Sequence, residues 1–113
     1  MDRNTLIAAT AAGLVLQLAM VVAGHYVPAV RDKGFAIGGM LFSLLAGVLY
    51  ARLAHGPWSG SLIGGAVAGG LCGFLGIGVS RLLGDVPTAL LLFGTLGSTV
   101  AGLAGGAIGK ILP

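Results

Sequence analysis

The chain has 113 residues, of which 57% are hydrophobic and only 8% are charged, and its mean hydropathy is +1.05. A soluble domain carries roughly 25% charged residues, so a chain this short and this apolar could not cover its hydrophobic side chains in water. Its net charge of +3 comes from basic residues that are scattered along the chain. They form no basic patch of the kind that binds nucleic acid. The sequence therefore predicts an integral, multi-pass membrane protein whose solvent is the lipid bilayer, without indicating which membrane.

The first apolar run extends from about Thr5 to Val27 and ends before Pro28, which disfavours helical geometry in the residue ahead of it. The core of the run is longer than the apolar region of a signal peptide, which is about 7–15 residues. The leader MDRNT also carries no net positive charge beyond the amino terminus. We therefore expect a transmembrane helix here rather than a cleaved signal peptide.

Three further apolar runs predict helices over about 35–53, 59–83 and 86–111. In the last break, Gly84 suits a helix C-terminus, Asp85 is placed as an N-cap and Pro87 falls in the first turn of the next helix. Each run is close to the roughly 20 residues that span a bilayer, and the short breaks allow only antiparallel neighbours. The expected fold class is all-α: one domain over 1–113, a four-helix bundle with up-down-up-down topology.

Aromatic and basic residues gather near the expected helix ends. Tyr26, Tyr50 and Trp58 are placed where an aromatic belt would meet the membrane surface. The basic residues divide evenly between the two sides, so they do not set the orientation of the chain. A chain without charge bias could insert both ways and form an antiparallel dimer. The two sets are Arg3, Arg52 and Lys110 on the side of the amino terminus, and Arg31, Lys33 and Arg81 on the other.

Small residues recur at every fourth position in the third run. In water, each glycine would destabilise a helix by about 1 kcal/mol relative to Ala. In lipid, a backbone group without a hydrogen bond costs more than a glycine does, so the helix is kept. Small residues at this spacing allow close backbone approach, so we expect this helix to be the most enclosed. The two adjacent rows are Gly60, Gly64, Ala68, Cys72, Gly76 and Ser80, and Ser61, Gly65, Gly69 and Gly73.

The fourth run repeats this pattern, with Gly94, Ser98, Gly102 and Gly106 in one row. We therefore predict a tight contact between the third and fourth helices, formed within one chain or between copies in an oligomer. The predicted helix-packing residues are Gly60, Gly64, Gly65, Gly69, Gly73, Gly76, Gly94, Ser98, Gly102 and Gly106.

A layer of weakly polar residues is predicted near the middle of the membrane: Gln17, Ser43, Cys72, Ser98 and Thr99. These side chains could line a pore or a solute site. They could equally form interhelical hydrogen bonds, which are worth about 0.6 kcal/mol per pair on average. Gln17 is the most informative member, because a buried amide needs several hydrogen-bond partners.

Groups for catalysis or metal binding are sparse. The chain order places His25 and His55 on opposite sides of the membrane, so within one chain they cannot share a metal or a haem. The chain has no glutamate, and no aspartate lies deep in an apolar run, whereas proton-coupled transporters need a buried acid. We therefore expect no enzyme activity, no catalytic residues, no metal and no bound cofactor.

Two functions remain open from the sequence. The first is a small membrane protein that acts through helix packing, as an accessory or assembly subunit of a larger complex or as a homo-oligomer. The alternative is a small oligomeric channel or an uncoupled facilitator for a small solute or ion, with the weakly polar layer as its lining.

Overall fold

The computed structural model describes residues 3–27, 35–84 and 86–112, and every regular element in these ranges is an α-helix. The helices are α1 (Arg3–Tyr26), α2 (Phe35–Ala54), α3 (Trp58–Leu82) and α4 (Thr88–Ile111). All four are long and apolar enough to cross a membrane. The predicted all-helical fold with four candidate membrane spans is therefore confirmed.

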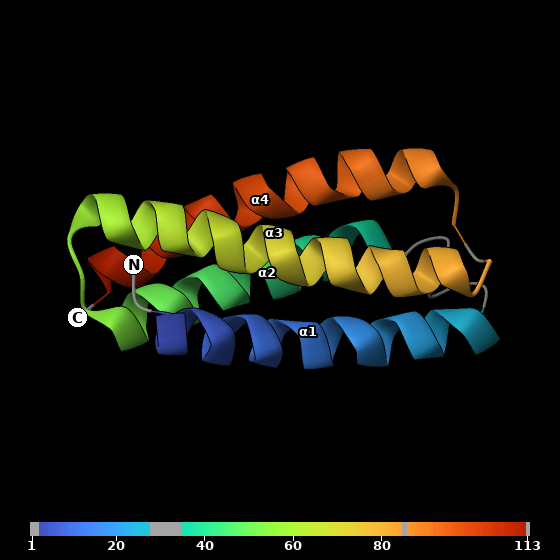
Figure 1. The fold of residues 1–113 in the computed structure, drawn as a ribbon, viewed down its shortest axis with the longest axis horizontal. Helices are drawn as coiled ribbons and strands as arrows, with labels where there is room; N and C mark the ends of the chain where they lie inside the picture. Colours follow the sequence, from blue (N-terminus) through green and yellow to red (C-terminus); the bar gives the residue numbers. More distant parts are fainter. Residues whose placement is uncertain (1–2, 28–34, 85, 113) are drawn as a thin grey trace.

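The helices form an elongated bundle in which α2 and α3 are central (Figure 1). Both central helices contact each other and both outer helices, whereas α1 and α4 make no contact with each other within the described ranges. The two chain termini lie at the same end of the bundle (Figure 1). We call the half of the bundle near them the terminal half and the other half the far half. The long axis measures 40 Å, close to the 40–45 Å of a bilayer with its headgroup regions.

The break between α3 and α4 differs from the prediction at one point. The N-cap of α4 is Pro87, with φ −79° and ψ 162° and no side-chain capping bond, and the helix begins at Thr88. The expected N-cap at Asp85 was therefore wrong, because the extended backbone of Pro87 delays the first turn; Asp85 itself lies outside the described residues. Gly84 follows the C-cap of α3 with φ +81°, and its N–H donates to Arg81 O at 3.0 Å, which fits its expected place at a helix C-terminus.

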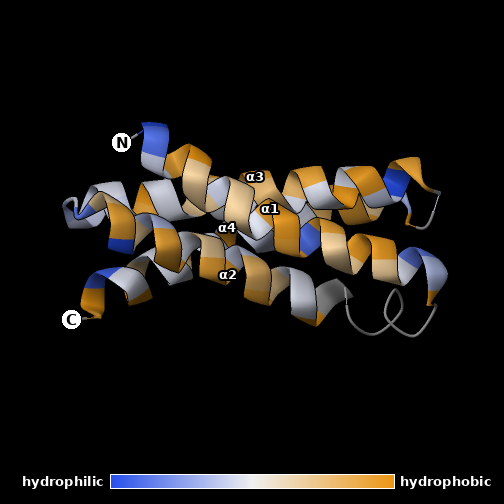
Figure 2. Ribbon diagram, turned by 90° about the horizontal axis from the view of Figure 1, so that it is seen from below, coloured by the Kyte–Doolittle hydropathy of each residue, from blue (hydrophilic) through white to orange (hydrophobic). Residues whose placement is uncertain are grey.

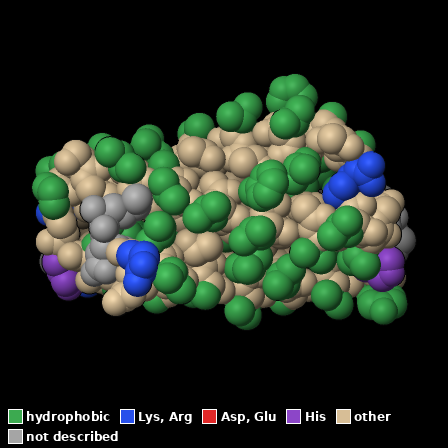
Figure 3. Space-filling view, viewed as in Figure 1, with side chains coloured by type: hydrophobic (Ala, Val, Ile, Leu, Met, Phe, Trp, Pro, Cys, Tyr) green, Lys and Arg blue, Asp and Glu red, His purple; other side chains and the backbone are tan. Residues whose placement is uncertain are grey.

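Large apolar side chains cover the face of the bundle seen in Figure 3, and Figure 2 shows hydrophilic residues mostly near the ends of the helices. Small residues fill the inside of the bundle. Val100 of α4 is 64% exposed, whereas Ala68 and Cys72 of α3 are fully buried. Of the four candidate spans, the α3 span has the largest buried share. This distribution is the reverse of that in a soluble protein. It suits a lipid solvent, in which large apolar side chains can stay exposed without a hydrophobic cost.

Tyr50 is the exception among the aromatic residues near helix ends. Tyr26 is 77% exposed and Trp58 is 49% exposed, but Tyr50 is only 1% exposed. The ring of Tyr50 packs directly against Gly64 of α3, in the space that a side chain at Gly64 would occupy. The expected placement of Tyr50 in an aromatic belt was therefore wrong, because a glycine on the neighbouring helix makes room for the ring inside the bundle.

Candidate functional site

One row of small residues on α3 faces α4. A Cβ built on Gly65 would lie 2.6 Å from the carbonyl oxygen of Gly102 and 2.9 Å from Cα of Gly106. A Cβ built on Gly69 would lie 2.6 Å from Cα of Gly102 and 2.7 Å from the carbonyl oxygen of Ser98. These neighbours are backbone atoms and cannot rotate away. At both positions the two helices therefore approach so closely that only glycine fits.

Helix α2 joins the same contact through Gly47, whose added Cβ would overlap the carbonyl of Gly102. On the other side, a Cβ on Gly106 would overlap the carbonyl oxygen of Ser61 in α3. Three helices thus meet backbone to backbone in the terminal half. We call this region the glycine junction; it comprises Gly47, Gly65, Gly69, Gly102 and Gly106.

The second row on α3 faces α1 and α2 instead. Gly64 meets the ring of Tyr50 on α2, and a Cβ on Gly76 would lie 3.0 Å from Cβ of Gln17 on α1. Between these positions, the thiol sulfur of Cys72 lies 3.1 Å from the place of a Cβ on Gly13. The two adjacent rows of α3 therefore pack against opposite sides of the bundle.

Besides Gly64 and Gly76, three more of the predicted packing residues lie elsewhere or touch only side chains. A Cβ on Gly60 would make ordinary contact with Pro57, at 3.6 Å, within the first turn of its own helix. Gly94 meets the end of the Ile77 side chain, and Gly73 meets the hydroxymethyl group of Ser98. These three positions do not belong to the backbone contact of the glycine junction.

Three of the five residues of the predicted polar layer form a hydrogen-bonded group, which we call the polar cluster: Gln17, Ser43 and Cys72. Nε2 of Gln17 lies 3.1 Å from Ser43 Oγ, 3.4 Å from the Gly39 carbonyl oxygen and 3.5 Å from Cys72 Sγ, and donates to these acceptors. The hydroxyl of Ser43 and the thiol of Cys72 each donate to the Gly69 carbonyl oxygen at 3.3 Å. The cluster therefore links α1, α2 and α3.

The other two residues of the layer are placed differently. Ser98 is 3% exposed and lies on α4 opposite Gly73. A Cβ on Gly73 would also lie 3.5 Å from Ser43 Oγ, so Ser98 borders the polar cluster. Thr99 instead donates to the Thr95 carbonyl oxygen of its own helix at 2.8 Å and stands outside the cluster.

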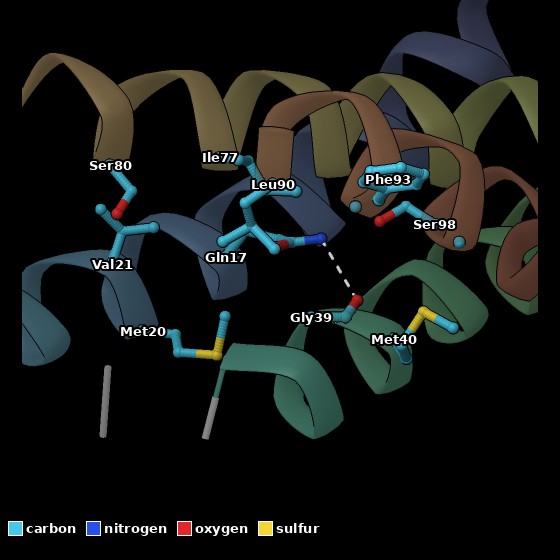
Figure 4. Close-up of a pocket in the computed structure, with 12 residues that line it drawn as sticks. Gln17, Met20, Val21, Gly39, Met40, Ile77, Ser80, Leu90, Phe93 and Ser98 are labelled. Carbon is cyan, nitrogen blue, oxygen red and sulfur yellow. Dashed lines mark hydrogen bonds between the residues drawn. The ribbon is translucent and has the colours of Figure 1, made fainter. Parts of the chain in front are cut away.

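A cavity of about 250 Å³ adjoins the polar cluster in the far half of the bundle (Figure 4). All four helices contribute to its walls, which are predominantly apolar. Figure 4 shows Gln17 at this cavity, with its amide nitrogen turned toward the carbonyl of Gly39. Ser98 and Ser80 are the other polar side chains of the wall. The apolar wall residues include Met20, Met40, Ile77, Leu90 and Phe93.

The charged and histidine side chains described here lie at the ends of the bundle. His25 is in the last turn of α1 and His55 follows α2, and the two histidine patches in Figure 3 are at opposite ends. Lys110 donates to the Gly56 carbonyl oxygen at 2.6 Å, and the guanidinium of Arg81 donates to Thr88 Oγ1 at 3.0 Å. No group of three metal-ligating side chains occurs among the residues that the structure describes.

Sequence reasoning missed the cavity and most of its wall. Of the residues in the wall, the sequence singled out only Gln17, Ser80, Gly94 and Ser98, and for other reasons. One signal was present: Ser80 ends a row of small residues and is the last uncharged polar residue before the end of α3. Nothing in a single sequence shows which large side chains of four helices surround a common space.

No family model matches the chain, and neither the curated proteins nor the solved structures contain a significant match to it.

Proposed function

We propose that this protein crosses the membrane four times, up-down-up-down, and acts as a non-catalytic accessory or assembly component. The observation that carries this proposal is the glycine junction. Because the backbones of three helices meet there, the bundle is compact, and its outer surface consists of large apolar side chains such as Leu92 and Val100, 65% and 64% exposed. Such a surface suits contact with lipid and with other membrane helices.

The distribution of polar groups supports a role without chemistry. None of the three aspartates lies within the bounds of the four helices. The polar cluster consists of neutral groups that bond to each other and to helix carbonyls. A nucleophile needs an adjacent base, and a coupled transporter needs a group that binds and releases an ion. The described part of the bundle interior offers neither.

The glycine rows stabilise the bundle of a single chain and do not form the surface that meets a partner. Gly65, Gly69 and Gly102 are buried against one another, so they are not available to another protein. Partner subunits, or a second copy in a parallel or antiparallel dimer, would dock on the outer apolar surface. The even charge distribution leaves both orientations open; Arg31 and Lys33, on which this balance depends, lie outside the described residues.

A facilitator for a small solute is the second candidate, and the cavity favours it because it reaches from the far half to the polar cluster near mid-depth. Beyond the polar cluster, however, the backbones of α2, α3 and α4 meet at the glycine junction. Passage through a single chain would require the helices around Gly102 to separate. The geometry therefore supports the accessory role better.

Extraction from the native membrane in a mild detergent, followed by native mass spectrometry and flux assays in vesicles, tests the proposal. We expect the chain to be extracted with other membrane subunits at one stoichiometry in repeated preparations, and the purified chain to leave vesicle permeability at background. Isolation as a homo-oligomer with solute flux that Gln17→Leu abolishes would overturn the accessory role in favour of the facilitator.

A further inference from the structure

We propose that the cavity in the far half binds a small apolar molecule that carries a hydroxyl group, an alcohol or a phenol, and that this hydroxyl donates a hydrogen bond to Oε1 of Gln17. This inference goes beyond the accessory role and does not depend on it. It rests on the size of the cavity, on two polar atoms in its wall and on its opening to the outside of the bundle.

The size of the cavity suits a ring system or a short chain. An apolar cavity of about 150 Å³ holds one benzene molecule, and this cavity measures about 250 Å³. A fused bicyclic ring is therefore the right scale. Water is a poor occupant, because a buried water needs about 2–4 polar partners, and most of this wall comes from residues such as Ile77, Leu90 and Phe93.

Gln17 supplies an acceptor in the wall. Its side chain is 2% exposed, and its Nε2 is already engaged by Gly39, Ser43 and Cys72. The hydrogen bonds of Gln17 within the described ranges all involve Nε2, and none of them involves Oε1, the second polar atom of the same amide. In the wall of an apolar cavity, an amide oxygen without a donor is unfavourable, so an occupant that brings an O–H is preferred over a hydrocarbon of the same shape.

Ser80 supplies a second polar atom further along the same wall. Its residue is 1% exposed, and its hydroxyl has no hydrogen-bond partner among the described residues. Gly76 packs against Gln17, and Ser80 follows Gly76 by one helical turn, about 6 Å along α3. A ligand can therefore meet the amide of Gln17 at one end and the hydroxyl of Ser80 one turn away.

The cavity opens to the exterior of the bundle. Two residues of its wall, Phe93 and Met40, are 72% and 43% exposed, so they lie at its rim. These are the side chains that would face lipid, and a ligand dissolved in the membrane could enter past them. The outer helices α1 and α4 do not contact each other in the described part of the chain. The cavity is therefore not closed by a contact between these two helices.

A matched pair of ligands tests the proposal with the full chain in bicelles. 1-Naphthol and 1-methylnaphthalene have nearly the same shape, but only the first carries a hydroxyl. Each is titrated while the backbone amide signals of Gly97, Gly94 and Ser80 are followed by NMR, with ligand expressed per lipid. We expect saturable shifts, with 1-naphthol half-saturating at up to about tenfold lower concentration, the value of one good hydrogen bond.

Three variants locate the site. Gln17→Leu should abolish the preference for 1-naphthol while leaving binding of 1-methylnaphthalene in place. Gly97→Val should abolish binding of both ligands, because a Cβ there would lie 3.2 Å from Met40 Sδ at the cavity wall. Gly78→Val is the matched control, since a Cβ on Gly78 would meet nothing within 4 Å, and it should bind both ligands like the wild type.

The wild-type comparison decides the proposal even if a variant fails to fold. Equal binding of the two ligands, or shifts that never saturate, would overturn it. A further arm adds a monoacylglycerol, whose hydroxyls sit on a lipid. Displacement of 1-naphthol by that lipid supports the proposal and assigns the natural ligand to the membrane, whereas binding of 1-naphthol without displacement supports it and assigns a free small molecule.

Discussion

The terminal half and the far half of the bundle use glycine in different ways. In the terminal half, Gly65 and Gly102 stand against backbone atoms of other helices, at distances that exclude any side chain. In the far half, Gly97 meets only the flexible end of Met40, and a Cβ on Gly78 would meet nothing. The same residue type therefore fixes the helices at one end of the bundle and borders a cavity at the other.

This difference teaches that the spacing of glycines does not by itself give the positions at which helices touch. Gly94 and Gly102 belong to the same row of α4. Of these two residues, only Gly102 lies against the backbones of other helices, because α2 and α3 both contact α4 there. Paired substitutions, one at a contact between helices and one away from it, measure this difference.

The largest expected effect is that of Gly69→Leu. Overpacking typically costs about 1–3 kcal/mol, and here the neighbours are the backbones of Ser98 and Gly102, so we expect a loss of about 3 kcal/mol or more. Reversible unfolding in bicelles measures the free energy, and native mass gives the oligomeric state. Gly78→Leu, on the same helix with open space around it, should stay within about 0.5 kcal/mol. Wild-type stability of Gly69→Leu would contradict the account.

The next effect is expected at Tyr50. Tyr50→Ala removes a ring that is 1% exposed and packed on Gly64, and large-to-small changes in a core leave a cavity. Aromatic truncations in soluble cores cost about 3–5 kcal/mol. Because lipid provides no hydrophobic driving force between helices, we expect a loss at or just below the low end of that range, about 2–3 kcal/mol. Tyr26→Ala, at a residue 77% exposed, should cost about 0.5 kcal/mol or less. Equal losses by the same unfolding assay would mean that Tyr50 is not enclosed.

A smaller effect is expected in the polar cluster. Gln17→Leu keeps the volume of the side chain but removes its hydrogen bonds to α2 and α3, and interhelical hydrogen bonds in membranes reach at most about 1.7 kcal/mol. We expect a loss of about 1 kcal/mol. Thr99→Val is the control, because Thr99 Oγ1 bonds only within its own helix. An equal loss for both variants would show that the cluster does not join the helices.

Much of the fold could be predicted from the sequence because lipid imposes strict local rules. A span needs a long apolar run, and the runs that start near Thr5 and Phe35 lie within a few residues of α1 and α2. Pro87 is informative in a similar way, since it marks the start of α4, although the exact cap was misplaced.

The site could be predicted only in part, because its formation depends on which helix faces which. Gln17, Ser43 and Cys72 were placed at one depth by counting from the helix ends, and the structure brings them together. Counting depth does not reveal rotation about the helix axis, so Thr99 was grouped with them although it bonds to its own helix. The burial of Tyr50 likewise depends on Gly64 of another helix, a pairing that a single sequence does not contain.

The most direct test of the central claim, that backbone contact at the glycine junction holds the terminal half together, compares Gly102→Ala with Gly97→Ala by reversible unfolding in bicelles. Both changes add one methyl group to the same helix. The account predicts a loss of about 2 kcal/mol or more for Gly102→Ala, since its Cβ would lie 2.8 Å from Cα of Gly69. Gly97→Ala should be neutral or stabilising by up to about 1 kcal/mol, because Met40 can move. Equal effects of the two substitutions would contradict the account.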